Sequence, residues 1–472
     1  MLRGNPEKRL LLSDVCCVEL GGSEVLKSGD IFYILIYMFL AEMSNGVVAP
    51  VPTEVVCEKV KYSEPDSLGS SGTNSDTDTE SDNEQEPDSD ADPERTKVPS
   101  SHPPELESAK GEGLQKQPQQ EIRRIPAQPR TDGDLHIHHI IECSCEVMTC
   151  QFNPEGTLLA VGLNDGTIKL YNPENGDFVK TIRDSSCIFA SMPVTSIRFC
   201  RSAESHSLLL ATYASGNVRC WYVWGGECLW SVKEVADNRE SEGTARRQTL
   251  CMSVSCSNEQ AATGGSDSTI HLYDLATHQT LQVCKASSTR TVMDGHRLRV
   301  FAVTFHPERE REFISGGWDN TIQFWDTRQQ HAVRMLSGPH ICGDALQIDP
   351  VTHQILSGSW RKDRTLEIWE YGSAEKVSEV LPDSYGNSKI YSCHWLGRDH
   401  ILAAGSQLNA LKVINRHTLM TESRYMGLSS AVFSSSVCPA GKWAGLIAAT
   451  SGNRVCLLDR GGQRVKKNTA SD

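Results

Sequence analysis

The residues with the most obvious capacity for chemistry lie together ahead of the first repeated segment of the chain. Imidazole nitrogens and thiolates are the ligands that Zn²⁺ prefers, and this stretch holds six of them: His136, His138, His139, Cys143, Cys145 and Cys150. Alternation along a strand, however, would place His136 and His138 on one face and His139 on the other. The chain also contains no CxxC pair. We therefore expect no metal site here, and interpret 135–141 as a strand with exposed histidines.

Other arrangements that support catalysis are missing from the sequence. It contains no Gly-rich phosphate loop, no Gly-x-Ser-x-Gly nucleophile elbow and no HExxH zinc motif, and each of these would place reactive groups at a defined turn or helix. An enzyme is therefore the weakest of the functional classes. We expect no cofactor and no small-molecule substrate.

Composition limits the partners and the compartment. The formal net charge of −14 over 472 residues argues against nucleic-acid binding, which needs a basic surface. The 17 cysteines are an odd number, and they are spread singly along the predicted strands, which indicates a reducing compartment rather than a disulfide framework. We expect an intracellular protein, in the cytoplasm, the nucleus or both, with protein partners.

The elements that must position any site are clearest between Asp294 and Arg328. This stretch opens with Gly295-His296 and closes with Trp325-Asp326. Between them, short alternating apolar runs are separated by turn residues, a pattern typical of an antiparallel meander of strands. The order of these features resembles one WD repeat, the unit of a β-propeller blade.

The resemblance implies roles for the polar residues. In the WD-repeat family the turn Asp accepts a hydrogen bond from the repeat's His, which contacts a Ser or Thr that in turn reaches the indole of the Trp. The residues here would be His296, Ser315, Asp319 and Trp325, and in the following repeat His340, Ser357, Asp363 and Trp369. Such a buried network stabilises the fold only when each member is satisfied. Its role is therefore structural.

Seven repeats follow one another towards the end of the chain. Each first strand ends on an inward apolar residue, and these are Phe152, Phe199, Val254, Phe305, Ile348, Trp395 and Val437. We therefore predict an all-β, seven-bladed propeller over residues 134–460. The last repeat lacks a fourth strand, so Leu135 to Ile141 is expected to complete the seventh blade and close the ring, as in the family.

The remainder of the chain is not predicted to belong to the propeller. Residues 1–62 are unassigned, and their apolar run from Ile31 to Ala41 is too short for a membrane span. Residues 63–133 are expected to be a disordered acidic and Pro/Gln-rich linker, since 63–94 contain twelve acidic and no basic residues. Residues 461–472 form a polar tail.

Equivalent positions across the repeats predict a binding site. Four residues before each inward residue, the first strand begins at the mouth of the central channel, where repeats four to seven present Phe301, Asp344, Tyr391 and Phe433. Aromatic faces beside a carboxylate suit a basic side chain. The alternative interpretation is that these aromatic residues fill the channel wall.

Two tryptophans extend the predicted site. Trp318 and Trp360 occupy the same turn position in neighbouring repeats, and Arg361 follows the second. Because Trp and Arg are enriched in binding hot spots, we expect a patch on the upper face of blades four and five. The first functional hypothesis is therefore a non-enzymatic scaffold that binds a partner peptide, basic in character, on this face.

A second hypothesis depends on the end of the fourth repeat. The segment from Phe313 to Arg328 ends in Trp325, Asp326 and Arg328. It resembles the box by which some WD-repeat proteins dock on the adaptor of a cullin-RING ubiquitin ligase. On this reading the chain would be a substrate receptor, and on the alternative reading Arg328 simply follows a strand at the surface.

Overall fold

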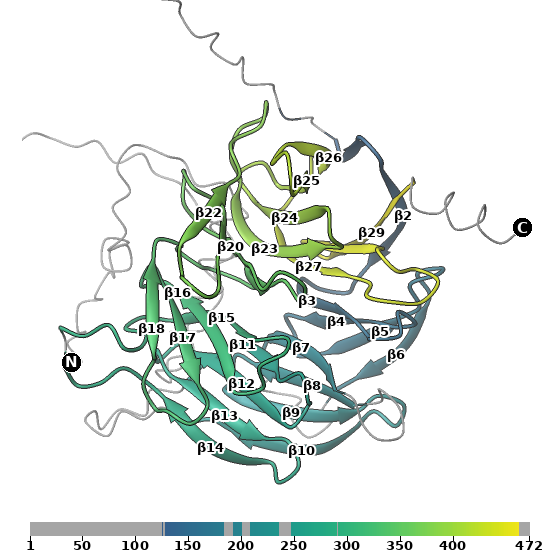
Figure 1. Cartoon of the computed structure of the whole chain (residues 1–472). Coiled ribbons are helices and arrows are strands. Elements are labelled where there is room, and N and C mark those ends of the chain that lie inside the picture. The colour runs from purple at the N-terminus through teal and green to yellow at the C-terminus, as the bar shows by residue number, and fades with distance from the viewer. Residues whose placement is uncertain are drawn as a thin grey trace, which may run out of the picture. The chain divides into compact units, whose positions relative to one another are not determined.

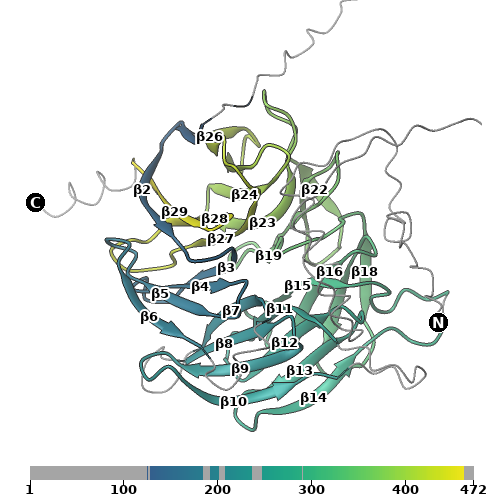
Figure 2. The ribbon, with the colours of Figure 1, turned by 180° about the vertical axis from the view of Figure 1, so that it is seen from behind.

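The computed structural model describes residues 125, 128–183, 192–200, 208–235, 247–289 and 291–461, and within these ranges every regular element is a β-strand. The strands form seven antiparallel sheets arranged around a central axis (Figure 1; Figure 2 shows the ring from behind). The predicted all-β, seven-bladed propeller is confirmed.

The first three blades follow the chain from the inside of the ring outwards. Blade one contains β3 (Val147–Phe152), β4 (Leu159–Leu163), β5 (Ile168–Tyr171) and β6 (Phe178–Ile182). Blade two contains β7 (Val194–Cys200), β8 (Leu208–Tyr213), β9 (Asn217–Tyr222) and β10 (Glu227–Lys233). Blade three contains β11 (Thr249–Val254), β12 (Gln260–Gly265), β13 (Ile270–Asp274) and β14 (Gln279–Cys284).

Blades four to seven repeat this order with two exceptions. Blade four contains β15 (Val300–Phe305), β16 (Glu312–Gly317), β17 (Thr321–Asp326) and β18 (Arg334–Ser337). Blade five contains β19 (Leu346–Ile348), β20 (Ile355–Gly358), β21 (Leu366–Trp369) and β22 (Lys376–Glu379). Blade six contains β23 (Lys389–Leu396), β24 (His400–Ser406), β25 (Ala410–Asn415), β26 (Thr421–Met426) and, as a fifth strand, β1 (Arg130–Asp132). Blade seven contains β27 (Val432–Val437), β28 (Ile447–Ser451), β29 (Arg454–Arg460) and β2 (Leu135–Glu142).

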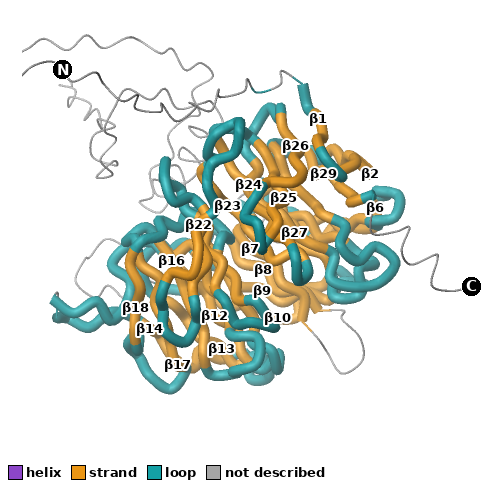
Figure 3. Tube along the Cα trace, turned by 45° about the horizontal axis from the view of Figure 1, so that its top comes forward, coloured by secondary structure: helices purple, strands orange, loops and turns teal. Residues whose placement is uncertain are grey.

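The innermost strands form a closed ring. Each of β3, β7, β11, β15, β19, β23 and β27 contacts the next, and β27 contacts β3. The second strands are buried on both faces, as in β4, where all five residues are buried. Apolar runs in these strands are therefore required by packing between neighbouring blades as well as within each sheet. Figure 3 shows the strands joined by loops at both ends of the blades.

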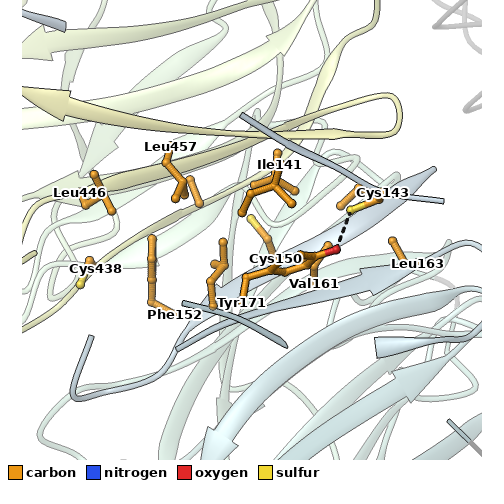
Figure 4. Packing of buried hydrophobic residues seen from close by; sticks show 14 residues of the cluster. Ile141, Cys143, Cys150, Phe152, Val161, Leu163, Tyr171, Cys438, Leu446 and Leu457 are labelled. Carbon is orange, nitrogen blue, oxygen red and sulfur yellow. Dashed lines mark hydrogen bonds between the residues drawn. The ribbon is translucent and has the colours of Figure 1, made fainter. Parts of the chain in front are cut away.

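The ring closes as predicted. Strand β2 pairs antiparallel with β29, so an N-terminal strand completes the last blade. Ile141 of β2 packs with Leu457 of β29 and with Phe152 of blade one in one buried cluster (Figure 4). The closing strand thus joins the first and last blades through a shared apolar core, which leaves no open edge in the ring.

The histidines of β2 depart from the predicted alternation. The register with β29 shifts between Ile137 and His139. This bulge lets the rings of His138 and His139 both reach the backbone carbonyl of Glu174, with Nε2···O distances of 2.9 and 3.1 Å. The expectation that these two histidines lie on opposite faces was wrong, because a bulge breaks the two-residue period of a strand.

The strand β1 was not predicted. Its three residues pair with β26 at the outer edge of blade six, and Arg130 donates a hydrogen bond to the Tyr385 hydroxyl. The expected linker over 63–133 therefore overlaps the propeller at its C-terminal end. Its short sequence, RTD, has no apolar alternation to reveal it.

The remaining expectations, for the N-terminal region and the C-terminal tail, fall largely outside the described residues. This applies to the unassigned segment 1–62, to the expected disorder of 63–124 and to the polar tail after Gly461. Across the portion of the chain that the structure describes, no helix has the length and apolar character of a transmembrane span.

Candidate functional site

The polar residues of blade four form a continuous chain of hydrogen bonds. His296 Nδ1 lies 2.8 Å from Asp319 Oδ2, and its Nε2 lies 2.7 Å from Ser315 Oγ. The Trp325 indole donates to the same Oγ at 2.7 Å. Burial by itself would raise the pKa of Asp319, but hydrogen bonds from His296, Arg297 and Thr321 lower it below the ordinary value. The network fixes the turn between β16 and β17 against the loop that enters the blade.

Blade five was expected to repeat this network and does so only in part. The Trp369 indole donates to Ser357 Oγ at 2.9 Å. His340 Nδ1, however, lies 2.8 Å from Asn320 Oδ1 of blade four, and Asp363 is exposed. The two extra turn residues, Arg361 and Lys362, place Asp363 beyond the reach of His340. The assignment of Asp363 to the network is therefore corrected.

Blade three contains a relay that the sequence did not reveal. Arg247 and Glu234 form an ion pair of 2.8 Å in which both side chains have an exposed fraction of 0%. Arg247 also donates to Asp267, while Glu234 accepts from Thr263 and, at 2.6 Å, from the Tyr273 hydroxyl. These two residues end the charged insertion 234–247, whose composition is typical of a surface loop. At its ends the segment is a buried part of the blade.

Bulges explain why the predicted channel positions converge. In six blades the register between the innermost strand and the next shifts by one residue at its start, whereas β19 of blade five pairs with β20 without a shift. The extra residue lies at or beside the fourth residue before the inward apolar one: Met148, Thr195, Leu250, Phe301, Tyr391 and Phe433. A bulge redirects a side chain, so these six blades present this residue towards the axis.

The aromatic residues at the channel mouth pack against their neighbours. Phe301, Tyr391 and Phe433 are 3%, 2% and 4% exposed. Tyr391 and Phe433 lie edge to face at 5.1 Å in one cluster with Met148 and Cys342. The expectation that these rings stand open for a guest is corrected, because side chains from several blades fill the mouth.

The carboxylate predicted to attract a basic guest already has a cation. Asp344 Oδ2 lies 2.8 Å from the guanidinium of Arg198, which reaches it from blade two. Below this pair, His394 bonds the Ser435 carbonyl at 2.7 Å, and burial lowers its pKa. The side chains of Asp344 and Arg198 remain 36% and 22% exposed. Asp344 therefore contributes to an internal bridge across the channel.

The two tryptophans lie where the sequence placed them, at the upper end of neighbouring blades. By upper face we mean the ends that carry the turns between second and third strands and the loops into the innermost strands. Trp318 stacks on Phe301 with centroids 5.3 Å apart, and Trp360 lies 6.4 Å from Tyr391. Both are half-buried. They form the exposed rim of the apolar cluster that closes the channel.

Each tryptophan also has a cation over its ring. The guanidinium carbon of Arg299 lies 5.5 Å from the centre of Trp318, and the ammonium of Lys389 lies 4.1 Å from that of Trp360. Sequence reasoning missed both cations, although Arg299 directly precedes β15 and Lys389 is the first residue of β23. The aromatic faces on this rim are therefore occupied by cations of the chain itself.

The segment that resembles an adaptor-docking box lies at the opposite end of blade four. Trp325 is buried at 2% and belongs to the hydrogen-bonded network. Arg328 has a side chain that is 64% exposed, and its guanidinium donates to the Asp326 carboxylate. Of the three residues, Arg328 alone projects far enough to meet a partner.

Metal ligands and thiols form no further site in the described ranges. Within them, no three His, Cys, Asp or Glu side chains are grouped to hold a metal ion. The cysteines described are free thiols, and most are buried.

A separate acidic group lies at the upper end of blade one, where burial raises the pKa of Glu146 to about 7.

Two family descriptions match parts of the chain. Residues 135–202 match the family described as "Anaphase-promoting complex subunit 4 WD40 domain". Residues 287–326, which contain the network of blade four, match "WD domain, G-beta repeat".

Curated relatives match a little over half of this chain and only part of their own length. "Cilia- and flagella-associated protein 52" of Bos taurus is 23% identical over 263 residues, which cover 54% of this chain and 38% of that protein. The chain thus spans well under half the length of this relative. "Guanine nucleotide-binding protein subunit beta" of Solanum tuberosum is 25% identical over 58% of this chain and 71% of its own.

A solved structure agrees with these matches on the fold. A chain of the "Crystal Structure of Mitotic Checkpoint Complex" superposes with a TM-score of 0.55 at 15% identity, and the match covers 77% of this chain and 98% of the other. At this identity the similarity concerns the fold alone.

Proposed function

Since this chain is a WD-repeat β-propeller protein, we propose that it is a non-enzymatic scaffold that binds a segment of a partner protein on the upper face of blades four to six. Propellers of this kind serve many roles, and fold alone does not select one. The proposal therefore depends on a particular surface. Its setting would be intracellular, in the cytoplasm or nucleus.

The observation that carries the proposal is the pair of tryptophans on the rim. Trp318 and Trp360 occupy equivalent turns of adjacent blades and lie half-exposed over one apolar cluster. The Trp360 indole nitrogen is buried and has no hydrogen-bond partner among the described residues. Indole rings that combine apolar area with an available N–H group are typical anchors of protein interfaces.

The predicted basic charge of the guest has weaker support than the surface itself. Asp344 is bridged to Arg198, and the rings of Trp318 and Trp360 face Arg299 and Lys389. A basic side chain would have to displace these cations. We therefore propose Trp318, Trp360 and Arg361 as contacts of the partner, and assign Phe301, Tyr391 and Phe433 to support beneath them.

Site-specific photo-crosslinking in cells tests this proposal. A benzophenone amino acid replaces Lys362, which is exposed in the upper turn of blade five beside the proposed contact Arg361, or Val351, which is 62% exposed at the lower end of the same blade. We expect a discrete crosslinked protein from position 362 and none from position 351. The reverse result, or equal labelling from both, would contradict an upper-face binding site.

The second candidate function is that of a substrate receptor for a cullin-RING ubiquitin ligase. The observation that favours it is the position of Arg328, exposed at the lower end of blade four while Trp318 lies at the upper end. Adaptor docking below and partner binding above would not compete. The pairing of Arg328 with Asp326 means that docking would have to replace that bond.

Co-purification of the adaptor tests this candidate separately. The full chain would retain the adaptor, and Arg328→Ala would lose it while keeping any protein that crosslinks at position 362. Equal retention by the parent chain and Arg328→Ala, or no adaptor with either, rejects the docking box. That result would leave the upper-face proposal intact.

A further inference from the structure

Two cations on the upper face have no anionic partner in the part of the chain that the structure describes. Lys389 is 4% exposed, and its ammonium lies over the Trp360 ring without an ion pair. Arg361, half-buried in the adjoining turn, likewise forms no described ion pair. A cation on a largely buried side chain without a counter-ion is unfavourable unless a partner arrives to pair with it.

Further donors near these cations lack acceptors. The Trp360 indole nitrogen and the hydroxyls of Ser388 and Ser406 are buried and have no hydrogen-bond partner among the described residues. Ser406 pairs with Lys389 across strands β23 and β24, and Ser388 directly precedes Lys389. Ammonium, guanidinium and indole groups can only donate. The surplus on this surface is therefore one of donors, and its complement is a group that only accepts.

At blades four and five, the carboxylates of the same face are bonded to other groups or exposed. Asp319 is bonded to His296, Asp344 is bridged to Arg198, and Asp363 is exposed on the turn that carries Arg361. The positive charge of Arg361 also contributes, after burial, to the lowered pKa of His340. Lys389 and Arg361 are therefore not neutralised by these carboxylates, although the whole chain is acidic.

We propose that Lys389, Arg361 and Trp360 form a docking surface for an Asp/Glu-rich segment of a partner protein. The inference deepens the proposed function by giving the partner a charge, opposite to the one the sequence suggested. Carboxylates would accept charge-assisted hydrogen bonds from Lys389 and Arg361. The serine hydroxyls and the indole N–H add further donors, and the half-buried Trp318 packs against the apolar part of the segment.

Fluorescence anisotropy with the full chain tests the proposal directly. The probes are labelled short peptides of alternating Glu and Ser, of alternating Lys and Ser, and of alternating phosphoserine and Ala. We expect the Glu peptide to bind, with an affinity that falls as salt is added, and the Lys peptide not to bind. Lys389→Met keeps an apolar stem over Trp360, and Arg361→Gln keeps a polar turn. Each should weaken binding about tenfold or more.

The controls separate charge recognition from loss of structure. Arg328→Gln removes one positive charge, more exposed than Lys389 or Arg361, from the lower end of blade four and should change the affinity less than twofold. Lys389→Arg retains the positive charge and should keep most of the binding. If the role of Lys389 were purely structural, the affinity would not depend on the charge at this position. Unchanged affinity in both Lys389→Met and Arg361→Gln overturns the proposal. So does preference for the Lys peptide, or binding of the phosphoserine peptide alone. A crosslink from position 362 that persists in that case would preserve the proposed function and reject only the acidic partner.

Discussion

Blades three and four perform the same mechanical task with different chemistry. In each, a chain of polar contacts runs from the Asp of an upper turn, through the loop that enters the blade, to an aromatic residue of the third strand. Blade four uses the relay of His296 and Ser315 between Asp319 and Trp325. Blade three uses the ion pair of Arg247 and Glu234 between Asp267 and Tyr273.

The equivalence extends to the backbone positions. Thr263 of β12 and Ser315 of β16 occupy equivalent positions. Each lies in the second strand of its blade and pairs with a residue near the upper end of the third strand. The relay also explains the glycine at position 265, because a Cβ at this position would overlap the Arg247 guanidinium. The propeller thus requires a polar connection at this position in each of these blades, although the side chains that provide it differ.

The two relays should differ most in the cost of losing one member. Arg247→Ala leaves Glu234 charged, unpaired and fully buried, which typically costs about 3–5 kcal/mol of stability. We expect the largest loss of melting temperature in this set, measured by calorimetry on the full chain. The double variant Arg247→Met with Glu234→Leu removes both charges and should be less damaged than the single one. A double variant as unstable as Arg247→Ala would contradict the importance of the unpaired charge.

Acid should affect the histidine of blade five, which lacks an Asp partner. Burial, with Arg361 nearby, lowers the pKa of His340 to about 4 from 6.5. Between these values the unfolded chain binds the proton and the folded one does not, so stability falls as pH decreases from 6.5 to 4. The total loss is on the order of 3 kcal/mol. Urea unfolding of the parent chain and of His340→Gln across this range should show the slope attributable to His340 only in the parent.

Breaking the blade-four relay should cost less than breaking that of blade three. Asp319→Ala leaves His296 Nδ1 and the Arg297 amide without their acceptor, a loss of about 1–3 kcal/mol. No formal charge is left unpaired in the interior, because the imidazole can remain neutral. Thermal melting of Asp319→Ala beside Arg247→Ala measures the difference. Equal destabilisation would show that the two relays are energetically alike.

Features encoded locally could be predicted from the sequence. The strands of blade four, Val300 to Asp326, follow from alternating apolar residues and a turn Asp that lie within one short segment. The closing strand was recognisable because the seventh repeat ends one strand short. The positions at the channel mouth were also found, since a bulge recurs at the same place in most blades.

Features that depend on distant partners could not be predicted. Arg198 and Asp344 are 146 positions apart, and their pairing changes Asp344 from a free carboxylate into half of a bridge. Similarly, nothing local shows that Phe301 or Tyr391 is covered by neighbouring blades. The burial of Arg247 and Glu234 was hidden for another reason: charged residues at the ends of an insertion usually indicate a solvated loop.

The smallest expected effect concerns Asp363, and it tests how the comparison extends to blade five. The sequence placed Asp363 in the position of Asp319, but two additional residues in its turn leave it exposed, and His340 bonds Asn320 instead. An exposed side chain without a structural contact contributes little, so Asp363→Ala should alter stability by less than about 0.5 kcal/mol. Asp319→Ala, measured in the same buffer, serves as the matched comparison. If Asp363→Ala destabilises the chain as much as Asp319→Ala, the turn of blade five must close on His340 in solution, and the two blades would share one relay after all.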